Sequence, residues 1–253
     1  MIAHGGVSPL TAKVTLLLGQ SNAVGQALFL DATPSVANFS NSLVSTWGSS
    51  FDSFTQLDAQ VNNNLNAGNS TTGYGVEIEI GQQYVADGIN QYLIKNAANG
   101  SGLYPSELLW TPYGSGTLYN RIIDYIGEAI TYFASVGLTP EWEMIWLQGE
   151  KDASNDSGLD ADTYYQTDLT ALISGIRTAV GDASMPVVLC SLTNLSPALP
   201  QTSKINTAFA NIAGSDSNIT LLDTSLWQKD DGIHYDATGI TSASTDIYNA
   251  LNP

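Results

Sequence analysis

Three residues of types that perform acyl transfer lie far apart in the chain. Ser21 directly follows an apolar run and a glycine, in the stretch GQSN at 19–22. A serine there is either part of a polar turn or a nucleophile, and a nucleophile needs a base and a group that orients the base. His234 is the candidate base, and Asp231, three residues earlier, could fold back so that its carboxylate meets the imidazole Nδ1–H. Taken alone, an Asp-x-x-His pair is a weak signal, because structural loops contain it too.

Other residues could fill the two partner roles. The second histidine, His4, lies in a glycine-rich N-terminal stretch, which favours a structural role or disorder. Asp230, which adjoins Asp231, is the alternative orienting acid. The candidate partners of a serine nucleophile are therefore His234 and one of these two aspartates.

Two further stretches could supply donors for an oxyanion. Gln148 ends the apolar run in WLQGEKDA, and a side-chain amide there could donate to the negative charge that develops during acyl transfer. Gly75, in GYGVEIEIG, could bring a backbone N–H close to a substrate because glycine has no side chain. Both stretches are also compatible with ordinary loops that contain solvated acids and turn glycines.

The elements that must position these residues alternate between strands and helices. Helical patterns lie between apolar runs, an order that indicates βαβ units. We therefore predict a three-layer α/β/α sandwich with a central, mostly parallel five-stranded sheet, in which ligands bind at the carboxyl ends of the strands. The five predicted strands are KVTLLL (13–18), QYLIKNA (91–97), EMIWLQ (143–148), PVVLCSL (186–192) and NITLLD (218–223).

The chain is predicted to form a single domain over residues 1–253. Residues 1–12 are expected to be an N-terminal tail. Residues 31–72 interrupt the alternation and are rich in Asn, Ser and Thr. A long irregular insert after the first strand is typical of a wall of a binding site, so we expect this one near the site.

Composition excludes several classes of partner. The net charge is −17, with only 7 Lys and Arg residues, whereas binding of nucleic acid or of an anionic membrane surface requires clustered basic residues. No apolar run is long enough to span a membrane, and a single cysteine permits no internal disulfide. The first residues lack a secretion-signal pattern, while the acidity favours an extracellular or virion-associated setting. The oligomeric state stays open.

At this point the sequence resembles the SGNH hydrolases, specifically the carbohydrate-esterase branch that includes sialate O-acetylesterases and acetylxylan esterases. The resemblance extends over residues 13–251. Three departures stand out: Ala23 replaces a Met, Val76 replaces a Pro, and NGSG replaces GGT. The motifs that carry it are LLGQSNAVG, GVEI, LIKNAANGSGL, IWLQGEKDA and DGIHYDATG.

The resemblance implies a mechanism and a set of site residues. Ser21 would be the nucleophile, His234 the general base and Asp231 the orienting acid, with no metal or organic cofactor. The implied oxyanion donors are the backbone N–H groups of Ser21 and Gly75 and the side chain of Gln148, and the acids implied to fix the strand-end loop are Glu150 and Asp152.

The implied substrate is an O-acetylated glycan. We expect a neutral one, because the two arginines, Arg121 and Arg177, lie in helical patterns rather than in a visible carboxylate clamp. A glycan-binding or structural module that lost the chemistry, and a lipase or thioesterase with the same three residues, are the alternatives. Aromatic residues that could stack on sugar rings, or instead belong to the core, are Trp47, Phe51, Trp110 and Tyr113.

Overall fold

Strand β1 (Leu10–Gly19) forms the centre of the sheet. It pairs in parallel along its whole length with β7 (Leu138–Leu147) and over seven residues with β6 (Gln91–Ala97). The described residues are 10–48, 53–59, 61, 73–103, 110–111, 116–154, 160–193 and 197–253 of a computed structural model. From Val14 to Gly19, β1 is buried throughout, so both of its faces are covered there, as is usual for parallel strands.

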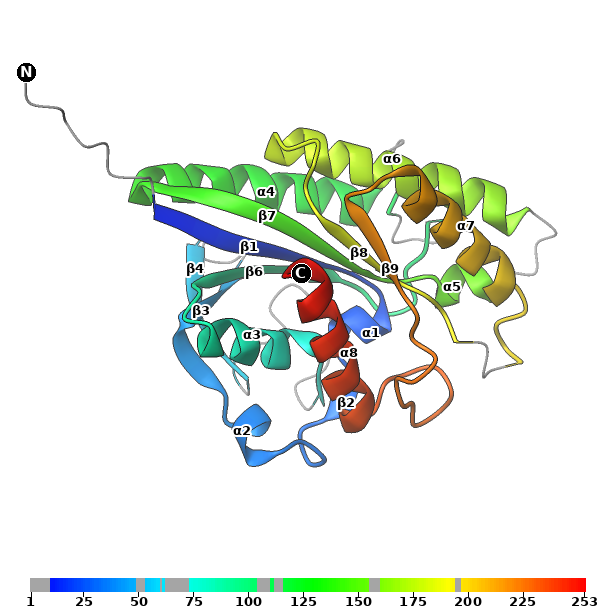
Figure 1. The fold of residues 1–253 in the computed structure, drawn as a ribbon, viewed down its shortest axis with the longest axis horizontal. Helices are drawn as coiled ribbons and strands as arrows, with labels where there is room; N and C mark the ends of the chain where they lie inside the picture. The colour runs from blue at the N-terminus through cyan, green and yellow to red at the C-terminus, as the bar shows by residue number, and fades with distance from the viewer. Residues whose placement is uncertain are drawn as a thin grey trace, which may run out of the picture.

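The sheet has seven strands rather than the predicted five. Its order is β4-β3-β6-β1-β7-β8-β9, and every pair is parallel except β3–β4 (Figure 1). Strands β8 (Val187–Cys190) and β9 (Ile219–Leu222) form one edge. The additional strands, β3 (Ser40–Gly48) and β4 (Ser53–Asp58), form the other.

The two additional strands come from residues 31–72, which we expected to be irregular. β3 is partly exposed and polar at most of its positions, so it lacks the apolar run by which the five predicted strands were recognised. Trp47 on β3 packs edge-on against Phe54 on β4, with ring centroids 5.0 Å apart. This segment therefore extends the sheet. It also contains the short helix α2 (Pro34–Ala37).

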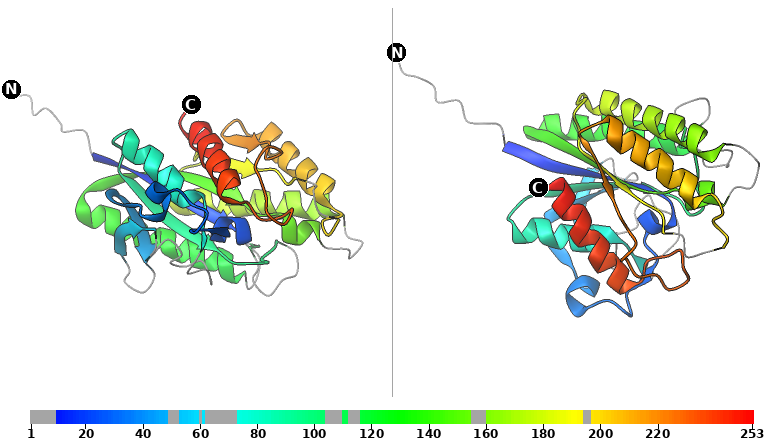
Figure 2. Two further views of the ribbon diagram at one scale, coloured as in Figure 1. Left: turned by 90° about the horizontal axis from the view of Figure 1, so that it is seen from below. Right: turned by 45° about the vertical axis from the view of Figure 1, so that its right-hand side comes forward.

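Helices cover both faces of the sheet. Helices α4 (Thr117–Val136), α6 (Ala161–Val180) and α7 (Thr202–Ser215) form one layer, and α3 (Val76–Ala86) and α8 (Ala237–Leu251) form the other (Figure 2). The layers bury separate apolar clusters: in β1, Leu16 and Leu18 belong to the first and Leu17 to the second. The predicted α/β/α sandwich is thus confirmed.

Several predicted features differ in detail or fall outside the described residues. Trp47 and Trp110 are fully buried, so they are core residues and cannot stack on a sugar. Phe51, Tyr113 and His4 lie outside the described residues, and residues 10–12 of the expected N-terminal tail already belong to β1. Of the helices in the described ranges, none is long and apolar enough to cross a membrane.

The remaining elements are short and lie around the carboxyl end of β1. They are α1 (Ser21–Val24), α5 (Glu150–Ala153), and the antiparallel pair of β2 (Ala27–Leu28) and β5 (Gly73–Tyr74).

Candidate active site

Ser21 is placed by a sharp exit of the chain from the central strand. Gly19 has a φ of +147°, and a Cβ built on it would lie 2.0 Å from the backbone oxygen of Leu147 on β7. Gln20 then donates its backbone N–H to the same oxygen at 3.0 Å. Only glycine permits this approach and this φ. Ser21 consequently becomes the first residue of α1, directly above the carboxyl end of the sheet.

A tight loop between β9 and α8 carries the other two predicted residues. Lys229 and Tyr235 form an isolated antiparallel bridge, which closes the loop. Inside it, Oδ1 of Asp231 accepts the backbone N–H groups of Ile233 at 2.9 Å and of His234 at 2.8 Å. This Asx turn folds the aspartate back toward the histidine, as the spacing predicted.

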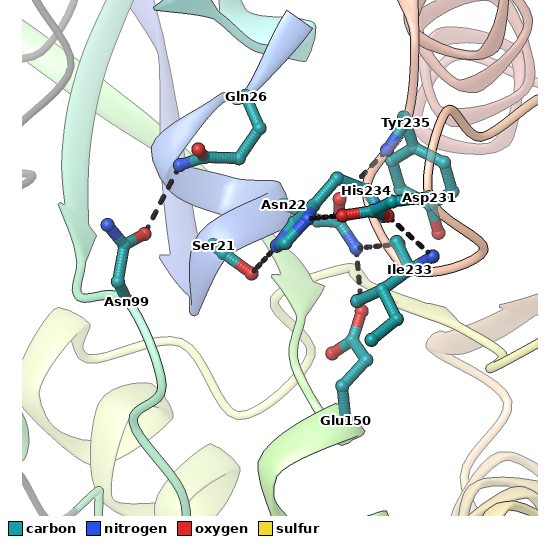
Figure 3. A network of polar contacts seen from close by, with 9 residues as sticks. All are labelled: Ser21, Asn22, Gln26, Asn99, Glu150, Asp231, Ile233, His234 and Tyr235. Atoms are coloured by element: carbon teal, nitrogen blue, oxygen red, sulfur yellow. Dashed lines mark hydrogen bonds and ion pairs between the residues drawn. The ribbon is translucent and has the colours of Figure 1, made fainter. Parts of the chain in front are cut away.

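The three side chains form one chain of hydrogen bonds (Figure 3). His234 Nε2 lies 2.9 Å from Ser21 Oγ, and His234 Nδ1 lies 2.7 Å from Asp231 Oδ2. In the described structure, the carboxylate on Nδ1 therefore belongs to Asp231 and not to its alternative, Asp230. The Asp231 and His234 side chains remain 55% and 33% exposed, whereas Ser21 is buried.

The environment of Asp231 keeps its carboxylate ionised. Partial burial opposes this, but hydrogen bonds from the His234 backbone and ring and from the Ile233 N–H outweigh it and lower the pKa to about 2. An ionised acceptor at Nδ1 favours the tautomer with the proton on Nδ1. Nε2 is then free to accept the Ser21 proton.

A pocket of about 420 Å³ opens over the contact between Ser21 and His234. Gln26 and Asn99 line one part of it, with Gln26 Nε2 donating to Asn99 Oδ1 at 3.3 Å. Lys151 also lines the pocket. A second cavity of about 410 Å³ lies between α6 and α7, and its described lining includes none of the three hydrogen-bonded residues. We therefore assign the functional site to the first pocket.

Gly75 lies beside α1, but its N–H has a partner other than the pocket. It donates to Oε1 of Glu77 at 3.0 Å, and Glu77 also pairs with the buried Lys95 at 3.1 Å. Among the described lining residues of the pocket, Gly75 does not occur. The structure thus places Gly75 behind the nucleophile helix, close to Gly25, which follows that helix.

Gln148 is buried beneath the site. Its Nε2 lies 3.2 Å from Gln20 Oε1, 3.1 Å from the Ser101 backbone oxygen and 2.6 Å from Asp152 Oδ2. Its Oε1 accepts the hydroxyl of Tyr165 at 2.8 Å. In this arrangement the Gln148 amide joins the carboxyl ends of β1 and β7.

The two acids of the WLQGEKDA stretch have separate partners. Asp152 accepts both the Gln148 amide and the Leu103 backbone N–H, the latter at 3.1 Å. Glu150 lines the pocket and accepts Nδ2 of Asn22 at 2.6 Å. Burial raises the pKa of Glu150, an effect that hydrogen bonds and nearby positive charges only partly offset.

Three residues of the pocket wall were not singled out from their types, and Asn22, beside the nucleophile, was expected only to shape the site. Gln26 follows α1 closely, Asn99 lies in the loop after β6, and Lys151 is the second residue of α5. Their only sequence signal is that they fall within or beside the motifs quoted above. The described residues contain no group of three or more His, Cys, Asp or Glu side chains that could hold a metal ion.

Comparisons with known proteins agree with this fold. A search of curated proteins finds no significant match. The fold is similar to that of a protein from Arabidopsis thaliana (TM-score 0.76, 17% identity, 97% of this chain and 98% of that one) and of NanS (0.70, 15%, 97% and 98%). It is also similar to a carbohydrate acetylesterase from Xanthomonas citri (0.67, 16%, 94% and 55%). At these identities the likeness concerns the fold.

The family itself is identified by a match over nearly the whole chain. Residues 11–251 match the family described as carbohydrate esterase, sialic acid-specific acetylesterase. The match confirms the resemblance drawn from the motifs. The chain belongs to this family of carbohydrate esterases, which are acetylesterases of the SGNH type.

Proposed function

We propose that the protein removes O-acetyl groups from carbohydrates, with Ser21 as nucleophile, His234 as general base and Asp231 as the acid that orients the base. The observation that carries the proposal is the continuous hydrogen-bond chain from Asp231 to Ser21 Oγ at a pocket. The family, whose members are carbohydrate esterases, supports an ester of a sugar as the substrate.

The proposed reaction proceeds through two acyl transfers. Nε2 of His234 accepts the hydroxyl proton while Ser21 Oγ attacks the acetyl carbonyl, and Asp231 stabilises the resulting imidazolium. The tetrahedral intermediate collapses as His234 gives that proton to the departing sugar oxygen. A water molecule, deprotonated by His234, then attacks the acetyl-enzyme and releases acetate and free Ser21.

The oxyanion is proposed to be held first by the backbone N–H of Ser21, which begins α1. A preorganised donor of this kind lowers the barrier by about 3 kcal/mol. Gly75 and Gln148 are the other predicted donors. To donate to the oxyanion, the Gly75 N–H would have to break its hydrogen bond to Glu77. The Gln148 amide would have to give up one of its present acceptors, such as Asp152, in favour of the oxyanion. The proposal therefore depends on Ser21 more than on these two.

The proposed substrate is an O-acetylated glycan bound by polar side chains. Gln26 and Asn99 offer amide donors and acceptors on the pocket wall, which suit the hydroxyl groups of a sugar. Stacking by Trp47 or Trp110 is ruled out by their burial.

The decisive experiment is acetate release by the wild type and by Ser21→Ala. An aryl acetate and a panel of acetylated neutral and acidic glycans serve as substrates, and circular dichroism checks that the variant folds. We expect kcat to fall by about 10⁴-fold or more, as for loss of a nucleophile in comparable enzymes. Full activity of Ser21→Ala would refute the assignment.

Two further measurements separate the alternatives. A fluorophosphonate probe is expected to label Ser21, whereas a glycan-binding module without the chemistry would bind glycan and stay unlabelled. Acetyl esters are expected to react faster than octanoyl esters, whereas a lipase would show the reverse order.

A further inference from the structure

Asn22, the residue after the proposed nucleophile, makes three buried hydrogen bonds to distant parts of the chain. Its Nδ2 donates to the backbone oxygen of Ile233 at 3.1 Å and to Oε1 of Glu150 at 2.6 Å. Its Oδ1 accepts the backbone N–H of Tyr235 at 3.2 Å. Asn22 itself is 2% exposed, so water does not replace these partners.

The two backbone partners of Asn22 flank His234 (Figure 3). The Ile233 oxygen belongs to the peptide group before His234, and the Tyr235 N–H belongs to the peptide group after it. One planar amide therefore holds both peptide groups around the histidine Cα. Because Asn22 follows Ser21 in the same helical turn, this amide relates the position of His234 directly to that of Ser21.

Glu150 determines which way the Asn22 amide faces. The Glu150 oxygen 2.6 Å away accepts from Nδ2, and the backbone oxygen of Ile233 and the N–H of Tyr235 require the same orientation, so the nitrogen points to Glu150 and Ile233 and the oxygen to Tyr235. The other carboxyl oxygen of Glu150 has no hydrogen-bond partner in the described part of the chain. Both side chains are almost fully buried, so the amide is not expected to flip.

We propose that Asn22 is a positioning residue, oriented by Glu150, that holds the His234 loop at the distance from Ser21 which proton transfer requires. This inference rests on the proposed function of Ser21 and His234. The need for such a residue follows from partial exposure: the side chains of Asp231 and His234 are 55% and 33% exposed, so packing fixes them only in part.

The expected effect of removing the amide is on catalysis more than on binding. Asn22→Ala removes all three hydrogen bonds and leaves the His234–Ser21 contact to hold the loop onto α1. A misplacement of about 1 Å in a catalytic group lowers the rate by about 100-fold. We therefore expect kcat to fall by about 100-fold while KM changes little.

The chain offers a matched control in Asn206. Its side chain also holds a loop, donating to the Leu192 backbone oxygen and accepting the Leu192 N–H, both at 2.8 Å. Asn206→Ala therefore removes hydrogen bonds of the same kind from a different loop. Both variants are expected to lose thermal stability, but only Asn22→Ala should lose kcat at constant KM.

Asn22→Asp keeps the experiment interpretable if the alanine variant fails to fold. It retains an acceptor for the Tyr235 N–H but places a second carboxyl against Glu150 and loses the donor to Ile233. The double variant Asn22→Asp/Glu150→Gln relieves the contact between like charges and still lacks that donor. We expect its stability to recover and its kcat to remain below the wild-type value.

The outcomes distinguish this inference from the proposed function. If Ser21→Ala is inactive and folded Asn22 variants keep wild-type kcat, the positioning role is overturned and the nucleophile stands. If kcat falls equally in Asn206→Ala, the effect is a general loss of structure and the inference is also overturned. If Ser21→Ala remains active, the proposed function itself fails.

Discussion

The buried pair of Lys95 and Glu77 offers a prediction whose size can be worked out from the structure. Neither side chain has any exposed surface, and Lys95 Nζ lies 3.1 Å from Glu77 Oε1 and 2.7 Å from the Val24 backbone oxygen at the end of α1. Burial lowers the pKa of Lys95, and Glu77 only partly restores it. At this distance and an effective dielectric constant of about 20, the charges attract by about 5 kcal/mol.

Lys95→Met removes one charge and leaves the other buried. Breaking such a pair costs about 3–5 kcal/mol, a large share of the roughly 5–15 kcal/mol by which a domain is stable. The free energy of unfolding is measured by urea titration, with the slope of the transition checked for each variant. The variant also removes the hydrogen bond from Lys95 to the Val24 oxygen at the end of α1. We therefore expect α1 to shift and the rate of ester hydrolysis to fall.

Two controls decide whether buried charge is the cause. Lys95→Met/Glu77→Gln removes both charges and keeps an acceptor for the Gly75 N–H, so it should recover much of the lost stability. Lys204→Met breaks an exposed surface pair with Asp160, 3.7 Å apart, and should leave the free energy of unfolding almost unchanged, because solvent screens such pairs. A single Lys95 variant as stable as the wild type, or a double variant no better than the single, would refute the reasoning.

Three other outcomes are expected. Burial raises the pKa of Glu143, so the stability that this carboxyl contributes is complete below its unfolded pKa and is lost as the pH rises through the folded pKa. The free energy of unfolding of Glu143→Gln should therefore increase relative to that of the wild type as the pH rises. A difference between the two proteins that does not change with pH would contradict this. Because the pKa of Asp231 is lowered to about 2, the stability linked to its carboxylate is lost only as the pH falls toward that value. The pH–rate profile should then show no protonation near pH 4, where a free aspartate titrates, and an acid limb there would argue against this assignment. Gly19→Ala places a Cβ 2.0 Å from the Leu147 oxygen and should lower both the melting temperature and activity, whereas an unchanged protein would contradict the close approach.

Most of the sheet is predictable because covered parallel strands are rich in apolar residues. The run at 91–97, which mixes apolar with polar residues, was predicted with the bounds that β6 shows. β3, which lies between β4 and β6, was missed because it is partly exposed and polar residues make up most of Ser40–Gly48. The predicted number of strands was consequently too low, because the missed strands lie in the most polar part of the sheet, where the sequence signal is weakest.

The site shows a similar division between local and distant information. Asp231 and His234 lie in one short loop, so their spacing predicts their contact. The surroundings of Gln148 depend on Gln20 and on the Ser101 backbone, 128 and 47 positions away. The Glu77 side chain, which accepts the Gly75 N–H, is in turn paired with Lys95 on another element. The bonds of Asn22 to residues more than 200 positions away are likewise invisible before the chain is folded.

The central position of β1 implies that the parts of the site differ in how readily they open. Ser21 follows a strand that is paired on both sides, and the amides of that strand should be among the slowest to exchange with solvent. The loop of Asp231 and His234 is only partly buried, and we expect it to detach from α1 in a partial opening that leaves the sheet intact. Activity should then disappear at a lower urea concentration than the far-ultraviolet signal, so enzymatic assays would report closure of this loop rather than survival of the fold.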